Sequence, residues 1–95
     1  MNKYESVCIL APDSTSDDVS NIMVKIQEKI QEFSKGPISF ENIGKKKLAY
    51  DIKNYTEGYY LVTNFESDSS VIDELERFYR ITDRVLKFIT VRRND

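Results

Sequence analysis

Hydrophobic positions along the chain follow two different spacings, and together these predict six elements of secondary structure. Apolar residues recur every three or four positions from Val19 to Phe33, which predicts an amphipathic helix over about residues 15–34. A second stripe of this kind follows Asp68 and predicts a second helix. Residues that favour strands dominate four further segments. These segments are 3–10, 38–53 with a bend near Gly44, 59–66 and 85–92.

Capping and turn residues mark the ends of several of these elements. Thr15 and Asp18 have the spacing of a capping box at the start of the first helix, with Asp in place of the usual Glu. Gly36 is the expected stop of that helix, and Pro37 follows it. Residues 55–58 are expected to form the turn that precedes the third strand.

The order of the elements, βαββαβ, predicts the α+β class and a ferredoxin-like fold. In this arrangement two helices cover one face of a four-stranded antiparallel sheet. The 95 residues are expected to form one such domain, because domains usually run from about 50 to 250 residues. The other face of the sheet would have no helix to cover it, and we expect Val7 and Ile9 to lie there.

Composition excludes several kinds of chemistry. The chain has no His and one Cys, so alone it cannot form a Ser-His-Asp or Cys-His catalytic system, an internal disulfide or a Cys-based zinc site. We therefore predict no catalytic residue, metal site, cofactor or small-molecule substrate, and the protein is not expected to be an enzyme. Cys8 lies in an apolar run and is expected in the core.

No secretory signal or membrane span is evident, which favours a cytoplasmic protein without membrane contact.

Charge is distributed unevenly along the chain. There are 14 Lys and Arg against 16 Asp and Glu, and the net charge of −2 argues against a polycationic RNA-coating protein. Local groups of cations can still contact phosphates and add salt-dependent affinity, although a solvated loop and tail would look the same in sequence. The residues that we expect to contact RNA are Lys3, Lys45, Lys46, Lys47, Lys53, Arg92 and Arg93.

Tyrosines lie in or beside most of the predicted strands, where they could form core edges, stack on bases or meet a protein partner. The segment that starts at Glu57 has some likeness to the third-strand signature of RNA-recognition motifs. Glu57 replaces the required cation, however, and Tyr60 replaces the small residue. That mode of RNA recognition is therefore not favoured.

Several segments, in the same order along the whole chain, carry a more specific likeness. They are Tyr4-Glu5 with Leu10 and Pro12, Gly44-Lys45-Lys46-Lys47-Leu48-Ala49-Tyr50-Asp51-Ile52, Gly58-Tyr59-Tyr60, and Arg80-Ile81 through Asp83 with Val85-Leu86-Lys87-Phe88. With these segments the sequence resembles the bacterial small-subunit ribosomal protein S-six family. Asp51 departs from the family, where Pro is frequent, and Ser6 stands where an apolar core residue is usual. Ser6 would therefore need a hydrogen-bond partner.

The resemblance implies a ferredoxin-like structural constituent of the small ribosomal subunit. It also implies binding to the central domain of small-subunit ribosomal RNA, as a heterodimer with small-subunit ribosomal protein eighteen. The candidate contacts for the protein partner are Val7, Ile9, Tyr50 and Tyr59. The alternative is a dimerising or small-molecule-sensing module of the same fold, in which the open face pairs with a second copy. An acylphosphatase-like enzyme is disfavoured because the loop over residues 11–16 has no cation.

Overall fold

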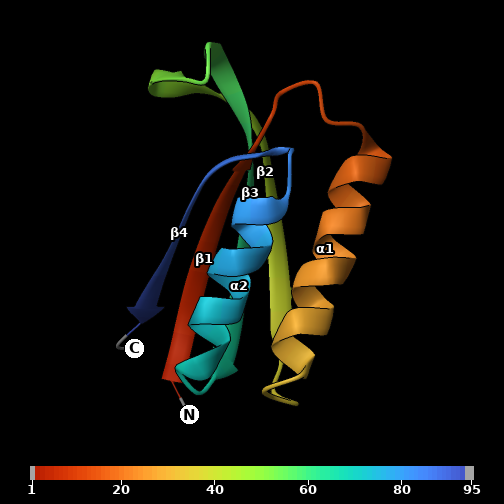
Figure 1. Ribbon diagram of the computed structural model, residues 1–95, viewed down its shortest axis with the longest axis vertical. Coiled ribbons are helices and arrows are strands. Elements are labelled where there is room, and N and C mark those ends of the chain that lie inside the picture. The colour runs from red at the N-terminus through yellow and green to blue at the C-terminus, as the bar shows by residue number, and fades with distance from the viewer. Residues whose placement is uncertain (1, 94–95) are drawn as a thin grey trace.

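The computed structural model describes residues 2–93, which form six elements in the predicted order βαββαβ (Figure 1). The elements are β1 (Asn2–Leu10), α1 (Ser16–Gln31), β2 (Ile38–Ile52), β3 (Tyr55–Ser67), α2 (Ser70–Ile81) and β4 (Val85–Arg93). The strands form one antiparallel sheet in the order β2-β3-β1-β4, so β1 lies inside the sheet and β2 and β4 are its edges. The ferredoxin-like α+β fold is confirmed.

The main core lies between the sheet and the two helices. Alternate residues of β1 point into it, from Tyr4 through Ser6 and Cys8 to Leu10, because side chains along a strand alternate between its faces. The helices supply the predicted apolar stripes, and full burial of such a side chain contributes about 1.5–3 kcal/mol. The buried helical residues are Val19, Ile22, Ile26 and Ile30 of α1, and Val71, Leu75, Phe78 and Tyr79 of α2.

The capping box that starts α1 is present as predicted. The amide of Asp18 donates to Thr15 Oγ1 at 3.1 Å, and the amide of Thr15 donates to Asp18 Oδ2 at 2.9 Å. These two bonds satisfy amides that the first turn of a helix leaves without intrahelical partners. A Thr–Asp pair at this spacing is therefore enough to fix where the helix begins.

Two predicted boundaries are wrong. Gly36 does not end α1, because the helix stops at Gln31. The amide of Gly36 instead donates to Ser34 Oγ at 3.0 Å in the loop that follows the helix. Residues 55–58 are not a turn but the first part of β3. The chain reverses at Lys53 and Asn54, with φ of 49° and 70°. Asn tolerates this left-handed conformation, but the absence of glycine there leaves little turn signal in the sequence.

The long hairpin of β2 and β3 is bent in two places. Its register shifts between Asn42 and Gly44, and again between Lys47 and Ile52. Gly44 has a φ of 93°, a conformation that glycine adopts without steric cost, and the predicted bend at this residue is confirmed. The hairpin therefore leaves the plane of the sheet beyond Gly44 and projects from one end of the molecule (Figure 1).

Candidate nucleic-acid and partner interface

The face of the sheet opposite the helices, here called the open face, carries an apolar band across three strands. Val7 of β1 lies opposite Val62 of β3 on one side and Ile89 of β4 on the other. Ile89 is 55% exposed, and Val91, two residues further along β4, is also exposed. Val7 is half-buried and Val62 is buried, so Ile89 and Val91 are the exposed part of the band. Exposed apolar side chains that lie side by side are typical of a contact surface. The expected position of Val7 on the open face is confirmed.

No helix covers the open face, as expected, but the β2–β3 hairpin covers one end of it. Residues of the hairpin pack there against β1 and the start of β4 in a second, smaller core. Its buried members are Ile9, Ala11, Leu48 and Leu86, with Ile52, Tyr55 and Tyr60 partly buried around them. Ile9 is on the open face as expected, but at 9% exposure it is a packing residue rather than an accessible contact.

Gly58 permits the close approach that this second core requires. A Cβ atom at this position would lie 2.4 Å from Ile9 Cγ2 and 3.2 Å from Leu48 Cδ2. The first distance is too short for two carbon atoms that are not bonded to each other, so only glycine lets the hairpin approach β1 this closely. The Gly58-Tyr59-Tyr60 segment thus has a steric reason for its glycine.

Tyr50 and Lys87 join the two edges of the sheet across the open face. Tyr50 belongs to β2 and Lys87 to β4, which share no backbone ladder. The Lys87 ammonium lies 4.9 Å from the centre of the Tyr50 ring and donates a hydrogen bond to its hydroxyl. Lys87 is not among the residues expected from the sequence to contact RNA. An even number of positions separates Lys87 from Arg93 along β4, so strand alternation places both side chains on the open face.

Strand alternation divides the three consecutive lysines of β2 between two faces. Lys46 lies opposite Gly58, on the open face, with its ammonium 5.8 Å from the centre of the Tyr60 ring. Lys45 lies opposite Tyr59 and therefore on the other face, and Lys47 shares its side. All three are exposed. The three lysines therefore lie on both faces of the hairpin and do not form one flat patch.

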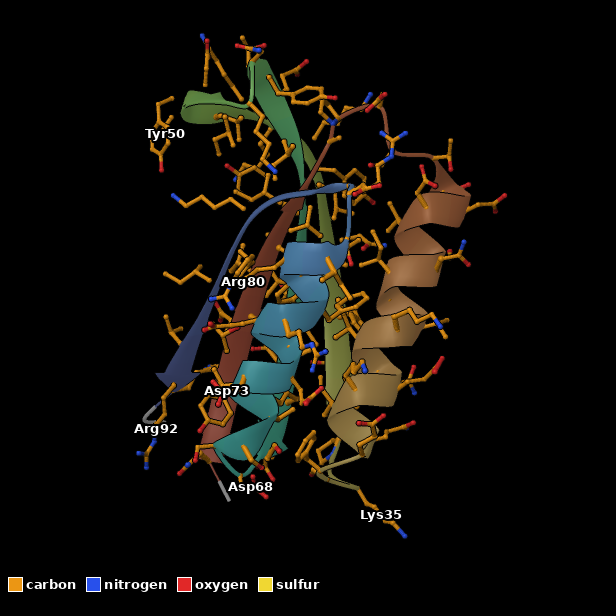
Figure 2. The ribbon with its side chains drawn as sticks, in the orientation of Figure 1. Lys35, Tyr50, Asp68, Asp73, Arg80 and Arg92 are labelled. Atoms are coloured by element: carbon orange, nitrogen blue, oxygen red, sulfur yellow. The ribbon has the colours of Figure 1, made fainter. Side chains whose placement is uncertain are left out.

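A second group of cations lies at the far end of the sheet. Lys3 pairs in register with Arg93, and Arg93 Nη1 donates to Asn64 Oδ1 at 3.0 Å on the open face. Arg92 lies opposite Tyr4 and so projects from the helix side. Figure 2 shows Arg92 and Tyr50 at opposite ends of the molecule. The predicted RNA-contacting residues therefore form two groups, with Lys53 in the hairpin group.

Tyr59 does not lie on the open face. It is opposite Leu10 in the β1–β3 register and packs, partly buried, against the main core. The sequence does not show which of the two consecutive tyrosines points into the core, because a shift of one residue exchanges the two faces of a strand. Its neighbour Tyr60 is the residue on the open face.

Carboxylates neutralise cations on the helix side of the molecule. Arg84 Nη1 lies 2.7 Å from Asp13 Oδ1, and its Nε lies 3.8 Å from Asp18 Oδ2. The hydrogen bond from the Thr15 amide, with a smaller contribution from Arg84, lowers the pKa of Asp18. Arg80 forms an ion pair at 3.2 Å with Glu76, one turn earlier on α2. Within residues 2–93 no ion pair involves Lys46 or Lys87, whose charges remain available to a ligand.

No group of three or more Cys, Asp or Glu side chains within residues 2–93 is placed to hold a metal ion. None of the helices there combines the length and the apolar character that crossing a membrane requires.

The sequence was compared with protein families and with solved structures. The family model described as Ribosomal protein S6 matches residues 3–92. The chain belongs to the ribosomal protein S6 family. It is therefore a protein of the small ribosomal subunit, and the family expected from the sequence motifs is confirmed.

Individual S6 proteins match this chain over almost its whole length. The small ribosomal subunit protein bS6 of Thermoanaerobacter pseudethanolicus is 40% identical over 95 residues, which are 100% of both chains. That of Gloeobacter violaceus is 33% identical over 93 residues, 98% of this chain and 97% of the relative. The crystal structure of 30S ribosomal protein S6 from Thermotoga maritima superimposes with a TM-score of 0.87 at 38% identity, covering 97% of this chain and 87% of that one.

Proposed function

We propose that this S6-family protein binds small-subunit ribosomal RNA, in its central domain, jointly with small-subunit ribosomal protein eighteen. The observation that carries the proposal is the layout of the open face. An apolar band, from half-buried Val7 to exposed Ile89 and Val91, lies between cations at both ends of the sheet. The apolar band suits a protein partner, and the cationic ends suit phosphates.

Charge on the open face favours RNA binding that depends on a partner. Glu5, Glu41 and Glu66 lie on the open face and reduce the positive potential of the cations that share it. Further acidic residues lie on α2, among them Asp73 (Figure 2). A chain of net charge −2 with segregated cations should bind RNA weakly by itself and better beside a basic partner.

Charge reversal of the hairpin lysines tests the RNA contact. We expect the triple change of Lys45, Lys46 and Lys47 to Glu to weaken binding to a transcript of the central domain in the presence of the partner. The slope of log affinity against log salt should fall by about 2, since each phosphate contact contributes roughly 0.7–0.9. The matched control reverses Lys25, Lys29 and Lys35, which lie in and after α1 on the helix side. Equal affinity of all three proteins at several salt concentrations would contradict the proposal.

Substitution of the apolar band tests the protein contact. Ile89→Asp should abolish co-purification with small-subunit ribosomal protein eighteen, because it places a charge in a surface that the partner would desolvate. Val24→Asp is the control, since Val24 is 52% exposed but lies on α1. Retention of the partner by the Ile89 variant would reject this surface. A stable homodimer of the isolated chain that Ile89→Asp dissociates would instead favour the dimerising alternative.

A further inference from the structure

The ring of Tyr50 is held in one position while most of its surface faces solvent. Its side chain is 60% exposed, yet the Lys87 ammonium contacts both its ring and its hydroxyl. Lys87 comes from the opposite edge of the sheet, so the contact also fixes the hairpin over the open face. A ring that is already ordered loses less conformational entropy when a ligand stacks on it.

A shallow depression lies beside this ring. Buried and half-buried apolar side chains line it, namely Ile9, Leu48, Ile52 and Tyr60, together with the exposed side chains of Tyr50 and Lys87. The lining is thus apolar and aromatic, with a cation at the margin. A second cation, Lys46, lies over the Tyr60 ring.

These features match a nucleotide better than a peptide. An ammonium group has three N–H donors, and the Tyr50 hydroxyl takes one from Lys87, which leaves two for phosphate oxygens. Neither Lys46 nor Lys87 forms an ion pair within residues 2–93, so both can accept an anionic partner. An unpaired nucleotide combines a flat π surface with an adjacent phosphate, and proteins bind such bases by stacking on aromatic rings.

We propose that the depression is a subsite for one unpaired nucleotide of the ribosomal RNA, whose base stacks on Tyr50 and whose phosphates contact Lys87 and Lys46. The inference rests on the proposed function and adds to it a specific ligand for the hairpin end of the open face. The base packs against the exposed side of the Tyr50 ring and the apolar lining. The subsite therefore selects single-stranded RNA, since a paired base cannot present its face.

The contributions of Tyr50 and Lys87 differ in their dependence on salt. Tyr50→Ala should weaken binding about 5- to 150-fold, the range that loss of one base–aromatic stack produces, with no change in salt slope. Tyr50→Phe should retain nearly all the affinity because the ring remains. Lys87→Gln should reduce the salt slope by about 0.7–0.9, the value for one phosphate.

The experiment is chemical probing of the central-domain transcript bound to the protein and small-subunit ribosomal protein eighteen. One nucleotide should be protected by the wild type and by Tyr50→Phe but reactive with Tyr50→Ala, while the rest of the footprint is unchanged. Ile43→Ala, which shortens another exposed side chain of β2, is the control and should protect the nucleotide. Thermal unfolding of each variant establishes that it is folded.

The outcomes separate the subsite from the proposed function. If the wild type with its partner does not bind the transcript, the proposed function fails and the subsite with it. If the wild type binds and Tyr50→Ala gives the same affinity and footprint, the subsite alone is rejected. A loss in Tyr50→Ala that is matched by an equal loss of partner affinity without RNA also rejects it, because the depression would then hold the protein partner.

Discussion

The hydroxyl groups of Ser6 on β1 and Tyr79 on α2 lie 2.7 Å apart inside the main core, although 73 positions separate them in sequence. Thr90 Oγ1 of β4 donates to Ser6 Oγ at 3.1 Å, so three elements meet at one polar point. Ser6 and Tyr79 are almost completely buried. The hydrogen-bond partner that Ser6 was expected to need is therefore present, and its polar side chain is compatible with the core.

Removal of the Tyr79 hydroxyl tests this contact. We expect Tyr79→Phe to lower the free energy of unfolding by about 1 kcal/mol, because Ser6 loses one of two buried hydrogen bonds. Tyr4→Phe is the control, since the Tyr4 hydroxyl only accepts a 3.2 Å bond from Asn2 in a partly buried position. Urea denaturation measures both changes. A Tyr79 variant as stable as the wild type would show that the bond contributes nothing.

Alkaline pH should destabilise the protein through Cys8 and Tyr79. Burial raises the pKa of the Cys8 thiol to about 12, and burial also raises the pKa of Tyr79 above its ordinary value. Above about pH 9 the unfolded chain begins to release protons that the folded protein keeps. Stability should therefore be constant through neutral pH and then fall by up to about 1.4 kcal/mol per pH unit for each group.

Urea denaturation between pH 8 and pH 11 measures this dependence. Cys8→Ala and Tyr79→Phe should each reduce the slope of stability against pH in the alkaline range. Identical slopes in all three proteins would mean that neither buried group resists ionisation.

Gly58→Ala should destabilise the protein by about 1–3 kcal/mol, the usual effect of forcing an extra carbon into a packed site. The added methyl would collide with Ile9 at 2.4 Å and lift the hairpin from the open face. Gly36→Ala is the control, since its Cβ would come no nearer than 3.3 Å to any neighbour, the side-chain oxygen of Ser34. Thermal unfolding compares the two. Equal melting temperatures would indicate that the hairpin moves aside at no cost.

Leu48→Ala and Ile89→Ala compare the covered and uncovered parts of the open face. Leu48 is buried in the second core, and its truncation should cost about 2 kcal/mol. Ile89 is exposed, so its truncation should change stability by less than about 0.5 kcal/mol. Urea denaturation distinguishes them. If the two changes are alike, the second core does not contribute to folding.

Local patterns were sufficient for the features that depend on neighbouring residues. The apolar stripe of α1 and the Thr15–Asp18 capping box needed only the spacing of residues within one helix. The bend at Gly44 followed from glycine in a long strand. The turn at Lys53 and Asn54 was missed because strand-forming residues follow it directly and no glycine marks it.

The arrangement of the site depended on contacts that no local pattern contains. Lys87 meets Tyr50 only because a bent hairpin crosses two intervening strands. The register between β3 and β1 determines to which face of the sheet Tyr59 and Tyr60 each point. Two adjacent tyrosines do not reveal that register. Apart from Lys87, the cations of the site were expected from the sequence, and the register of the strands determined which of them share a face.

The inner position of β1 has a consequence for the order in which the protein is made. β1 is the first strand to be synthesised, yet its two neighbours in the sheet, β3 and β4, are the third and the last. A nascent chain that has not yet reached β4 leaves one side of β1 without hydrogen bonds and Ser6 without Thr90. Pairings of such long sequence separation form late in folding. The native sheet can therefore close only after almost the whole chain has left the ribosome that made it.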